Sequence, residues 1–409
     1  HYKYRMAVRR GYPHLNQNQP RHRLLLVTNS YLPYATHSID QNDIDAVVRV
    51  LQSEWLTTGP AVDRFEKAIA DYCGARFAVA VNNGTAALHA AVHAAGIGPG
   101  DEVIVPPISF VATANAVVYS GAIPVFADVD PDSLLLDPEQ AAAKISFKTK
   151  AIIAVDYAGQ ACAYDRLRTL CDRHGLILIS DACHSLGGAY KGRKCGCLAD
   201  MTVFSFHPVK PITTAEGGMV LTDNSNFAQK IKLFRNHGIS SDFRQRQQHK
   251  QWQYAMVQIG YNLRLSDIHA ALGLSQLRKI DDWTAARNHL ANRYDEALGQ
   301  MEQVKPLTHR PECTHSYHLY VVRVPHRSRI FTLMRDKNIG VNVHYLPIHL
   351  QPYYQQRFGT KPGDCPVAET AYQHILSLPL FVAMVPGDVD RVVNSLKSAI
   401  HELAIEDRS

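Results

Sequence analysis

The chain has 409 residues, of which 46% are hydrophobic and 20% charged, and this length and mixture predict two packed domains. The composition excludes a disordered chain, a collagen-like fibre and a minimal disulfide scaffold. Six basic residues precede the first acidic one, Asp40, and they account for the whole net charge of +6, because 37 basic residues face 37 acidic ones in the remainder. A neutral body gives no electrostatic case for a nucleic acid or a membrane surface as partner.

Residues 1–23 form a basic leader, which we expect to be solvated and for which we predict no fold. No stretch reaches the roughly 18 apolar residues that span a bilayer, and Leu24–Val27 is too short for the apolar core of a signal peptide. The 8 cysteines are scattered, at a density far below that of a disulfide-stapled secreted domain. We therefore expect a soluble cytoplasmic protein with reduced thiols.

The first predicted domain, residues 24–245, is of the α/β class. Short β-branched runs alternate with segments of helical length, which predicts a mostly parallel sheet covered by helices. The predicted strands are Phe77–Val81, Glu102–Pro106, Ile123–Ala127, Ala151–Asp156, Leu176–Ser180, Met201–Phe206 and Gly218–Thr222. The predicted helices between them are Thr85–Gly96, Ala112–Ser120, Pro138–Ile145 and Asp165–His174.

The second predicted domain, residues 246–409, is smaller and of the α+β type. It opens with one long helix from Ser266, a plausible N-cap, to about Leu298. Strands are predicted at Tyr317–Val324 and Gly340–Tyr345, and a last helix capped by Asp388.

Polar residues follow three of the predicted strands, where the ligand crevice of an open α/β sheet lies. After Phe77–Val81 a small-residue turn containing Gly84 opens a helix, where a phosphate is favoured, although this signal alone is weak and an ordinary turn and cap is the commoner explanation. Asp181 ends a buried run and needs either a cation or a structural ion pair. Lys210 stands between two prolines in an apolar setting, where desolvation lowers an amine's pKa, although most lysines are surface residues.

These three features are the parts of an enzyme that uses pyridoxal 5′-phosphate. The lysine forms a Schiff base with the cofactor, the carboxylate keeps the pyridinium nitrogen protonated, and the helix N-terminus takes the phosphate.

With these residues in hand, the chain resembles fold-type I aminotransferases of the DegT/DnrJ/EryC1/StrS sugar-aminotransferase family from about Ile39 to Ile400. The phrases that carry the resemblance are Leu56–Pro60, Asn83–Leu88, Asp181–His184, Ser205–Lys210, Glu216–Gly218 and Gly260–Asp267. Within the family, Ser205–Thr213 and His344–Tyr354 are most similar to the branch of pseudaminic acid biosynthesis. The resemblance implies a large, mostly parallel mixed sheet flanked by helices, a smaller α+β C-terminal domain, and a homodimer with shared active sites.

The resemblance also implies roles for particular residues. Lys210 and Asp181 correspond to the Schiff-base lysine and the partner of the ring nitrogen, and Phe110 to an aromatic stacked on the ring, with a core phenylalanine as its plain alternative. Gly84, Thr85 and Ser205 correspond to contacts with the phosphate, and His184 to a contact with the phenolic oxygen. Asn262, and less surely Arg264, correspond to contacts that reach the phosphate from a neighbouring subunit. His344 and Tyr345 correspond to contacts with the substrate.

The implied reaction moves an amino group from an amino acid, expected to be L-glutamate, to C4 of UDP-2-acetamido-2,6-dideoxy-β-L-arabino-hexos-4-ulose. The product is UDP-4-amino-4,6-dideoxy-N-acetyl-β-L-altrosamine. Three alternatives stay open: an aminotransferase for another nucleotide 4-keto or 3-keto sugar, a catalytically idle regulatory relative, and a zinc enzyme built on Cys195 and Cys197, whose C-x-C spacing lacks a second pair. No metal is predicted.

Overall fold

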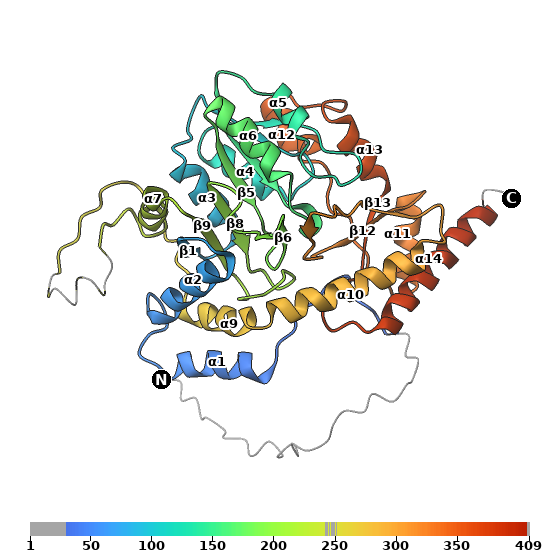
Figure 1. Ribbon diagram of the computed structural model, residues 1–409, viewed down its shortest axis with the longest axis horizontal. Coiled ribbons are helices and arrows are strands. Elements are labelled where there is room, and N and C mark those ends of the chain that lie inside the picture. The colour runs from blue at the N-terminus through green and yellow to red at the C-terminus, as the bar shows by residue number, and fades with distance from the viewer. Residues whose placement is uncertain (1–29, 242–243, 245, 247–249, 251, 407–409) are drawn as a thin grey trace, which may run out of the picture.

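The computed structural model describes residues 30–241, 244, 246, 250 and 252–406. Helices cover a central sheet, and a smaller sheet with the long C-terminal helix lies at one end of the body (Figure 1). The predicted basic leader, residues 1–23, lies outside the described residues. Within the described part, no helix is both long enough and apolar enough to cross a membrane.

The central sheet has seven strands in the order β1-β9-β8-β5-β4-β2-β3. Strand β9 runs antiparallel to both of its neighbours, and the other neighbouring pairs are parallel, so β1, β8, β5 and β4 end at the same edge. The bounds are β1 Phe77–Val81, β2 Glu102–Val105, β3 Ile123–Phe126, β4 Thr149–Val155, β5 Ile177–Asp181, β8 Met201–Ser205 and β9 Gly218–Thr222. All seven predicted strands are confirmed, with ends that differ by two residues at most.

Both faces of this sheet are buried, as the continuous apolar runs predict. In β1, Val79 and Val81 pack into the cluster that contains α3, while Ala78 and Ala80 pack on the other face with α2 and α9. The helices of this part are α1 Gln41–Leu51, α2 Pro60–Cys73, α3 Gly84–Ala94, α4 Ala112–Tyr119, α5 Pro138–Ala143, α6 Tyr164–His174 and α7 Ser225–Arg235, with a 3-10 turn η1 at Tyr157–Gly159.

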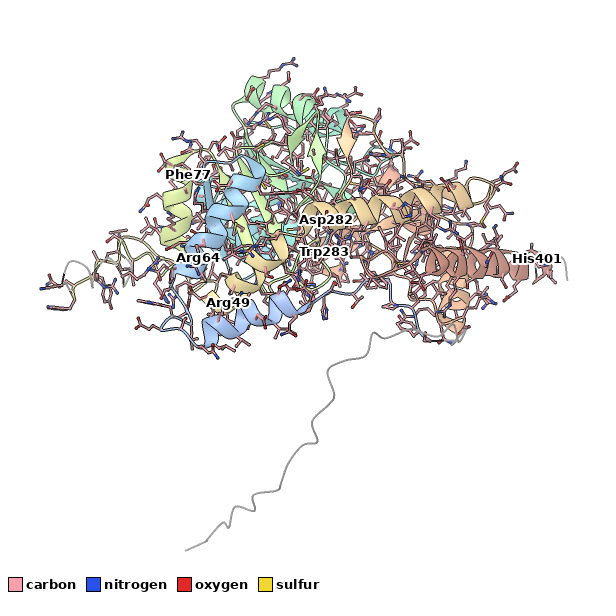
Figure 2. The ribbon with its side chains drawn as sticks, turned by 60° about the horizontal axis from the view of Figure 1, so that its bottom comes forward. Arg49, Arg64, Phe77, Asp282, Trp283 and His401 are labelled. Atoms are coloured by element: carbon pink, nitrogen blue, oxygen red, sulfur yellow. The ribbon has the colours of Figure 1, made fainter. Side chains whose placement is uncertain are left out.

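The single long helix predicted from Ser266 is wrong, because the chain forms two helices, α9 Asp267–Leu277 and α10 Ile280–Leu298. Ser266 is confirmed as the N-cap. At the break, the side chains of Gln276 and Lys279 both bond to the buried carboxylate of Asp43 on α1, at 2.6 and 2.7 Å. The apolar spacing continues across this turn, so periodicity alone predicts one helix. From the break α10 runs from Asp282 and Trp283 toward α14, which carries His401 (Figure 2).

The C-terminal part contains a three-stranded antiparallel sheet in the order β10-β12-β13. Tyr317–Val324 is confirmed in its central part, as β12. Gly340–Tyr345 is wrong as a strand, because only Asn342 forms a bridge, to Ser377, and the segment continues to the cavity described below. The elements are β10 Lys305–Pro306, β12 Tyr320–Arg323, α11 Arg327–Asp336, η2 Ile348–Leu350, α12 Pro352–Phe358, α13 Pro366–His374, β13 Ile375–Leu378 and α14 Pro386–Glu406.

The last helix begins earlier than predicted. Pro386 is its first residue, and the carboxylate of Asp388 accepts a hydrogen bond from the Val385 N–H at 3.0 Å, so Asp388 lies in the first turn rather than at the cap. A third small sheet, β11-β6-β7, joins Cys313–Thr314, Ala189–Tyr190 and Arg193–Lys194. The domain division at residues 245/246 stays a proposal.

Candidate active site

A cavity of about 410 Å³ opens where β1, β5 and β8 end. All the predicted site residues except Asn262 and Arg264 line it, namely Gly84, Thr85, Phe110, Asp181, His184, Ser205, Lys210, His344 and Tyr345. They come from five separate parts of the chain, and parallel strands bring three of these parts to one edge.

Lys210 lies in the turn that follows β8. Its backbone N–H donates to the His207 carbonyl at 2.9 Å, and its side chain is half-buried in the cavity wall. Burial lowers the pKa of the Lys210 amine, and the nearby Cys183 and Asp181 oppose that shift. A lowered pKa raises the fraction of neutral amine, which is the form that attacks a carbonyl or accepts a proton.

Asp181 is the last residue of β5 and is buried. One carboxylate oxygen, Oδ2, accepts a hydrogen bond from the Thr113 hydroxyl at 2.7 Å, and Oδ1 accepts a longer one from the Cys183 N–H at 3.3 Å. No ion pair to Asp181 is found among the described residues, so the structural ion pair left open above is not observed there. A buried carboxylate at a cavity wall is suited to a cationic ligand group.

The start of α3 lines the same cavity as Lys210. The Asn83 side chain caps the helix by accepting from the Ala86 N–H at 2.8 Å, which leaves the first turn directed at the cavity. A Cβ on Gly84 would lie 2.8 Å from the Cβ of Ser205, so only glycine permits this approach. Thr85 and Ser205 add two hydroxyl groups to the cavity wall. Small residues, hydroxyls and a helix N-terminus together suit a phosphate group.

Phe110 is not a core residue, because its side chain is 58% exposed on the cavity wall. This excludes the plain alternative of a core phenylalanine and leaves the ring face available to a ligand in the cavity. Its ring centroid lies 6.2 Å from that of Tyr345.

His184 is buried beneath the cavity. Its Nε2 lies 3.3 Å from the Tyr345 hydroxyl, and its Nδ1 is buried with no partner among the described residues. Burial, assisted by the charge of Lys210, lowers the pKa of His184 well below its usual value. The ring is therefore neutral at physiological pH and retains hydrogen-bonding capacity for a ligand.

The segment carrying His344 and Tyr345 is tied to the larger part of the chain. Tyr157 donates to the His344 carbonyl, and the His344 Nδ1 lies 2.8 Å from the Ser377 hydroxyl. The Ile348 N–H donates to the Pro107 carbonyl at 2.8 Å, close in sequence to Phe110. These bonds hold the wall opposite Lys210 in place.

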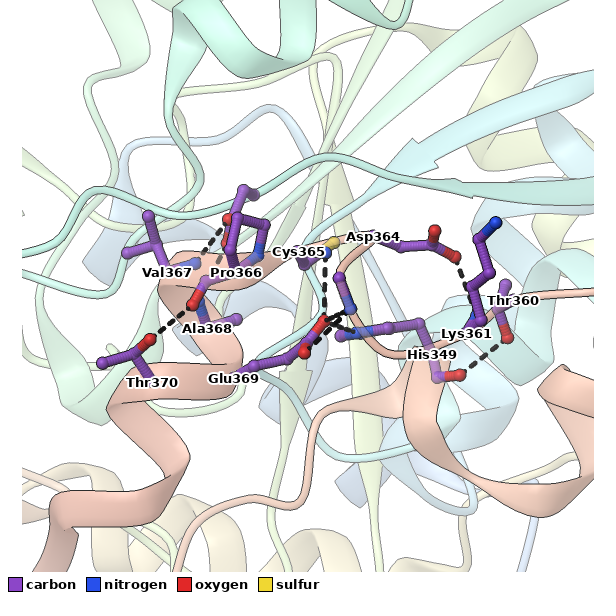
Figure 3. Close-up of polar contacts among 12 residues, drawn as sticks. His349, Thr360, Lys361, Asp364, Cys365, Pro366, Val367, Ala368, Glu369 and Thr370 are labelled. Carbon is purple, nitrogen blue, oxygen red and sulfur yellow. Dashed lines mark hydrogen bonds and ion pairs between the residues drawn. The ribbon is translucent and has the colours of Figure 1, made fainter.

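Farther along the same segment, a buried pair organises the loop (Figure 3). The His349 Nε2 lies 2.9 Å from a Glu369 carboxylate oxygen, which also accepts from the Gly363 and Cys365 N–H groups at 2.8 and 3.2 Å. Thr360 donates to the His349 carbonyl at 2.6 Å. The loop is thus anchored at several points rather than by its apolar contacts alone.

Asn262 and Arg264 lie outside the cavity of their own chain. Asn262 is exposed, and the Arg264 guanidinium donates to the Asn236 side chain at 2.8 Å. Their predicted contact with the phosphate stays a prediction.

Sequence reasoning missed several cavity residues. Thr113 touches Asp181, and Ser109 touches Thr113; their i, i+4 spacing at the start of a predicted helix was an available signal. His318 packs on His184 with ring centroids 4.3 Å apart, but it precedes a strand, so the strand-end rule does not find it. Among the described residues, no group of three or more metal-ligating side chains lies together, at Cys195 and Cys197 or elsewhere.

The residues present fit pyridoxal phosphate. Gly84 leaves the space that a phosphate cradle requires, the partnerless Nδ1 of His184 and the buried Asp181 supply polar contacts, and the exposed Phe110 supplies a face for a ring. Lys210 supplies a desolvated amine beside them.

Acid should destabilise the fold through His344. Burial, assisted by the charge of Lys210, lowers the pKa of His344 to about 4, whereas a histidine in the unfolded chain titrates at about 6.5. Between these pH values the unfolded state binds a proton that the native state does not. The free energy of unfolding should therefore fall as the pH drops from about 6.5 toward 4, by up to about 3 kcal/mol from this residue, and the contribution is constant above that range.

Urea unfolding of wild type and His344→Asn at pH 7 and pH 4.5 checks this. The variant should lose less stability on acidification than wild type does. An identical loss in both proteins would contradict the assignment.

Comparisons with known proteins agree with this geometry. The model of the DegT/DnrJ/EryC1/StrS aminotransferase family matches residues 37–397. The spore coat polysaccharide biosynthesis protein SpsC of Bacillus subtilis is 40% identical over 381 residues, which cover 91% of this chain and 98% of SpsC.

Solved structures share the fold over nearly the same part of the chain. PseC of Helicobacter pylori, an aminotransferase involved in the biosynthesis of pseudoaminic acid, superimposes with a TM-score of 0.85 and 35% identity, over 91% of this chain and 100% of PseC. Spr1654 of Streptococcus pneumoniae in its PMP form gives a TM-score of 0.86 and 31% identity, over 91% of this chain and 99% of its own, and is also solved in a PLP form. The fold is the predicted one of fold-type I pyridoxal-phosphate-dependent transferases.

Proposed function

Because the chain belongs to the DegT/DnrJ/EryC1/StrS aminotransferase family and is a pyridoxal-phosphate-dependent sugar aminotransferase, we propose that it aminates C4 of UDP-2-acetamido-2,6-dideoxy-β-L-arabino-hexos-4-ulose. The amino donor is L-glutamate, and the products are 2-oxoglutarate and UDP-4-amino-4,6-dideoxy-N-acetyl-β-L-altrosamine. The observation that carries this choice is the cavity wall of His344 and Tyr345, because it belongs to the phrase that resembles the pseudaminic acid branch. The likeness to PseC along the whole of that protein supports the same choice.

When bound, pyridoxal phosphate supplies a carbon that carries the amino group between the two substrates and a ring that withdraws electrons from the reacting carbon. Lys210 would hold the cofactor, and its amine would accept the proton that leaves the donor Cα and supply the proton that the sugar C4 gains in the second half-reaction. The Asp181 carboxylate holds the proton on the ring nitrogen. The first turn of α3, with Ser205, binds the phosphate, and Phe110 covers one face of the ring.

A second candidate is supported by a separate observation. The relative SpsC, at 40% identity, takes part in spore coat polysaccharide biosynthesis, which favours another nucleotide-linked 4-keto or 3-keto sugar as acceptor.

A panel of nucleotide keto sugars distinguishes the two candidates. The purified enzyme with pyridoxal phosphate and glutamate is incubated with the UDP-linked N-acetylated 4-keto sugar, with a dTDP-linked 4-keto-6-deoxyhexose and with a UDP-linked 3-keto sugar. Mass spectrometry then detects the amino sugar. Amination of the first compound with the highest kcat/KM supports the proposal, whereas amination of another compound in its place would replace it by the second candidate.

We also propose a homodimer with shared active sites. The segment 252–262 extends away from the body past α7 (Figure 1). It exposes a series of large apolar side chains, Trp252, Tyr254, Met256, Val257 and Ile259. Exposed apolar residues gathered on one segment are typical of a protein interface, and Asn262 does not reach the cavity of its own chain. A second copy would both cover the segment and receive Asn262 at its phosphate site.

Mixed dimers test this arrangement. Lys210→Ala should inactivate its own site, and Asn262→Asp should weaken phosphate binding in the partner's site by charge repulsion. Co-expression of the two variants with different tags yields a heterodimer with one intact site, so we expect roughly half of the wild-type kcat. Asn226→Asp, at an exposed position on α7, is the matched control for the added charge. A heterodimer as inactive as both parents would show that each site is built from a single chain.

A further inference from the structure

Two buried hydroxyl groups form a chain that ends on Asp181. Thr113, in the first turn of α4, is fully buried, and its Oγ1 lies 2.7 Å from the Asp181 Oδ2. Ser109 lies four residues earlier, before α4 begins, is 3% exposed, and its Oγ lies 2.7 Å from the Thr113 Oγ1. Asp181 comes from β5, 68 residues beyond Thr113.

The direction of both hydrogen bonds follows from the proton count. A carboxylate only accepts, so Thr113 uses its single hydroxyl proton toward Asp181. In the contact with Ser109, Thr113 is therefore the acceptor and Ser109 the donor. Each bond polarises the next, so the chain stabilises negative charge at its carboxylate end.

The two oxygens of Asp181 are consequently different. Oδ2 is engaged by a short, buried hydrogen bond, whereas Oδ1 receives only the 3.3 Å contact from the Cys183 N–H. The hydrogen bond to Oδ2 fixes the orientation of the carboxylate and leaves Oδ1 with capacity for a further donor. A carboxylate held in this orientation can accept a hydrogen bond from a pyridinium N–H.

We propose that Ser109 and Thr113 are positioning residues that orient Asp181 and keep the ring-nitrogen proton on the cofactor. The inference rests on the proposed role of Asp181 but is independent of the sugar acceptor. Neither hydroxyl needs to touch the substrate or the cofactor for this role.

Four substitutions test the proposal. Thr113→Val keeps the shape and removes the donor, Thr113→Ser keeps the donor, and Ser109→Ala removes only the outer member of the chain. Thr202→Val is the matched control, because Thr202 is a fully buried threonine of β8 whose hydroxyl has no partner in the described part of the chain.

The main readout is the ¹⁵N chemical shift of the ring nitrogen in enzyme reconstituted with ¹⁵N-labelled pyridoxal phosphate. In Thr113→Val the shift should move toward that of the unprotonated ring, and in Ser109→Ala it should move by a smaller amount. The kcat of the glutamate half-reaction should fall roughly ten- to hundredfold in Thr113→Val, as expected for a lost hydrogen bond to a charged group. Thr113→Ser and Thr202→Val should behave as wild type.

A wild-type shift and kcat in Thr113→Val would overturn the proposal. So would a Thr113→Ser enzyme as impaired as Thr113→Val, because the loss would then come from packing of the methyl group. If Thr113→Val does not fold, the ¹⁵N shift of the ring nitrogen in Ser109→Ala decides, and a wild-type shift there would overturn the proposal. An Asp181→Asn enzyme with an unchanged ring-nitrogen shift would instead refute the role of Asp181 itself. This variant therefore separates a failure of the proposed function of Asp181 from a failure of the positioning role of Ser109 and Thr113.

Discussion

Lys210→Ala should lose turnover by at least about 10³-fold, because the same amine is proposed to hold the cofactor and to move the proton at the reacting carbon. Desolvation lowers the pKa of this amine, and among the described residues no other lysine lines the cavity to substitute for it. Lys210→Arg should be as inactive as Lys210→Ala, since a guanidinium retains the charge but is not a nucleophile.

The chemical measurement is borohydride reduction followed by peptide mass mapping. Wild type should carry a phosphopyridoxyl mass on the peptide that contains Lys210, and the variants should carry none. Lys191→Ala, which removes an exposed lysine paired with Asp165, is the control and should retain full labelling and turnover. Methylamine added to Lys210→Ala should restore part of the rate. A label on any other lysine in wild type would refute the assignment.

Asp181→Asn should reduce kcat by about 10²- to 10⁴-fold while the dissociation constant of pyridoxal phosphate changes less than about tenfold. The amide has the same shape as the carboxylate but carries no charge, so the ring nitrogen loses the partner that keeps it protonated. Phosphate binding at α3 and the covalent bond from Lys210 remain. The loss therefore falls on the chemical step rather than on cofactor affinity.

The two quantities are measured separately, kcat at saturating cofactor and the dissociation constant by fluorescence titration of the apoprotein. Asp165→Asn, at a half-exposed carboxylate on α6, is the matched control. Near-normal turnover in Asp181→Asn, or in the more severe Asp181→Ala, would remove the proposed role of this carboxylate.

Much of this architecture was predictable because its signals are local. Apolar runs such as Leu176–Ser180 are buried on both faces, so each is readable without knowing its neighbours. Parallel strands end at one edge, so Asp181 and Lys210, separated in sequence, could be assigned to the same crevice before any coordinates existed. The turn at Gly84 follows β1, so the same rule assigned it to that crevice as well.

Other features depended on contacts between distant segments. The break between α9 and α10 is held by Asp43, which lies on α1, and no periodicity in residues 266–298 contains that information. The segment Gly340–Tyr345 has the composition of a strand, but the bond from Tyr157 to the His344 carbonyl, and that from the Ile348 N–H to Pro107 just beyond it, direct it to the cavity instead. The exposure of Phe110 on the cavity wall also depends on the tertiary structure, and it excludes a core position for this ring.

The sequence by itself therefore predicted the class of the fold, the strand edge at which the cavity opens, and that Lys210, Asp181 and the start of α3 meet on its wall. Tertiary structure alone decided what surrounds these residues: the hydroxyl chain on Asp181, the neutral His184 and His318 pair, and the position of Asn262 outside its own cavity. The physical reason is that hydrophobic periodicity is a property of short segments. Hydrogen bonds and desolvation depend on which atoms from remote segments come within about 3 Å of each other.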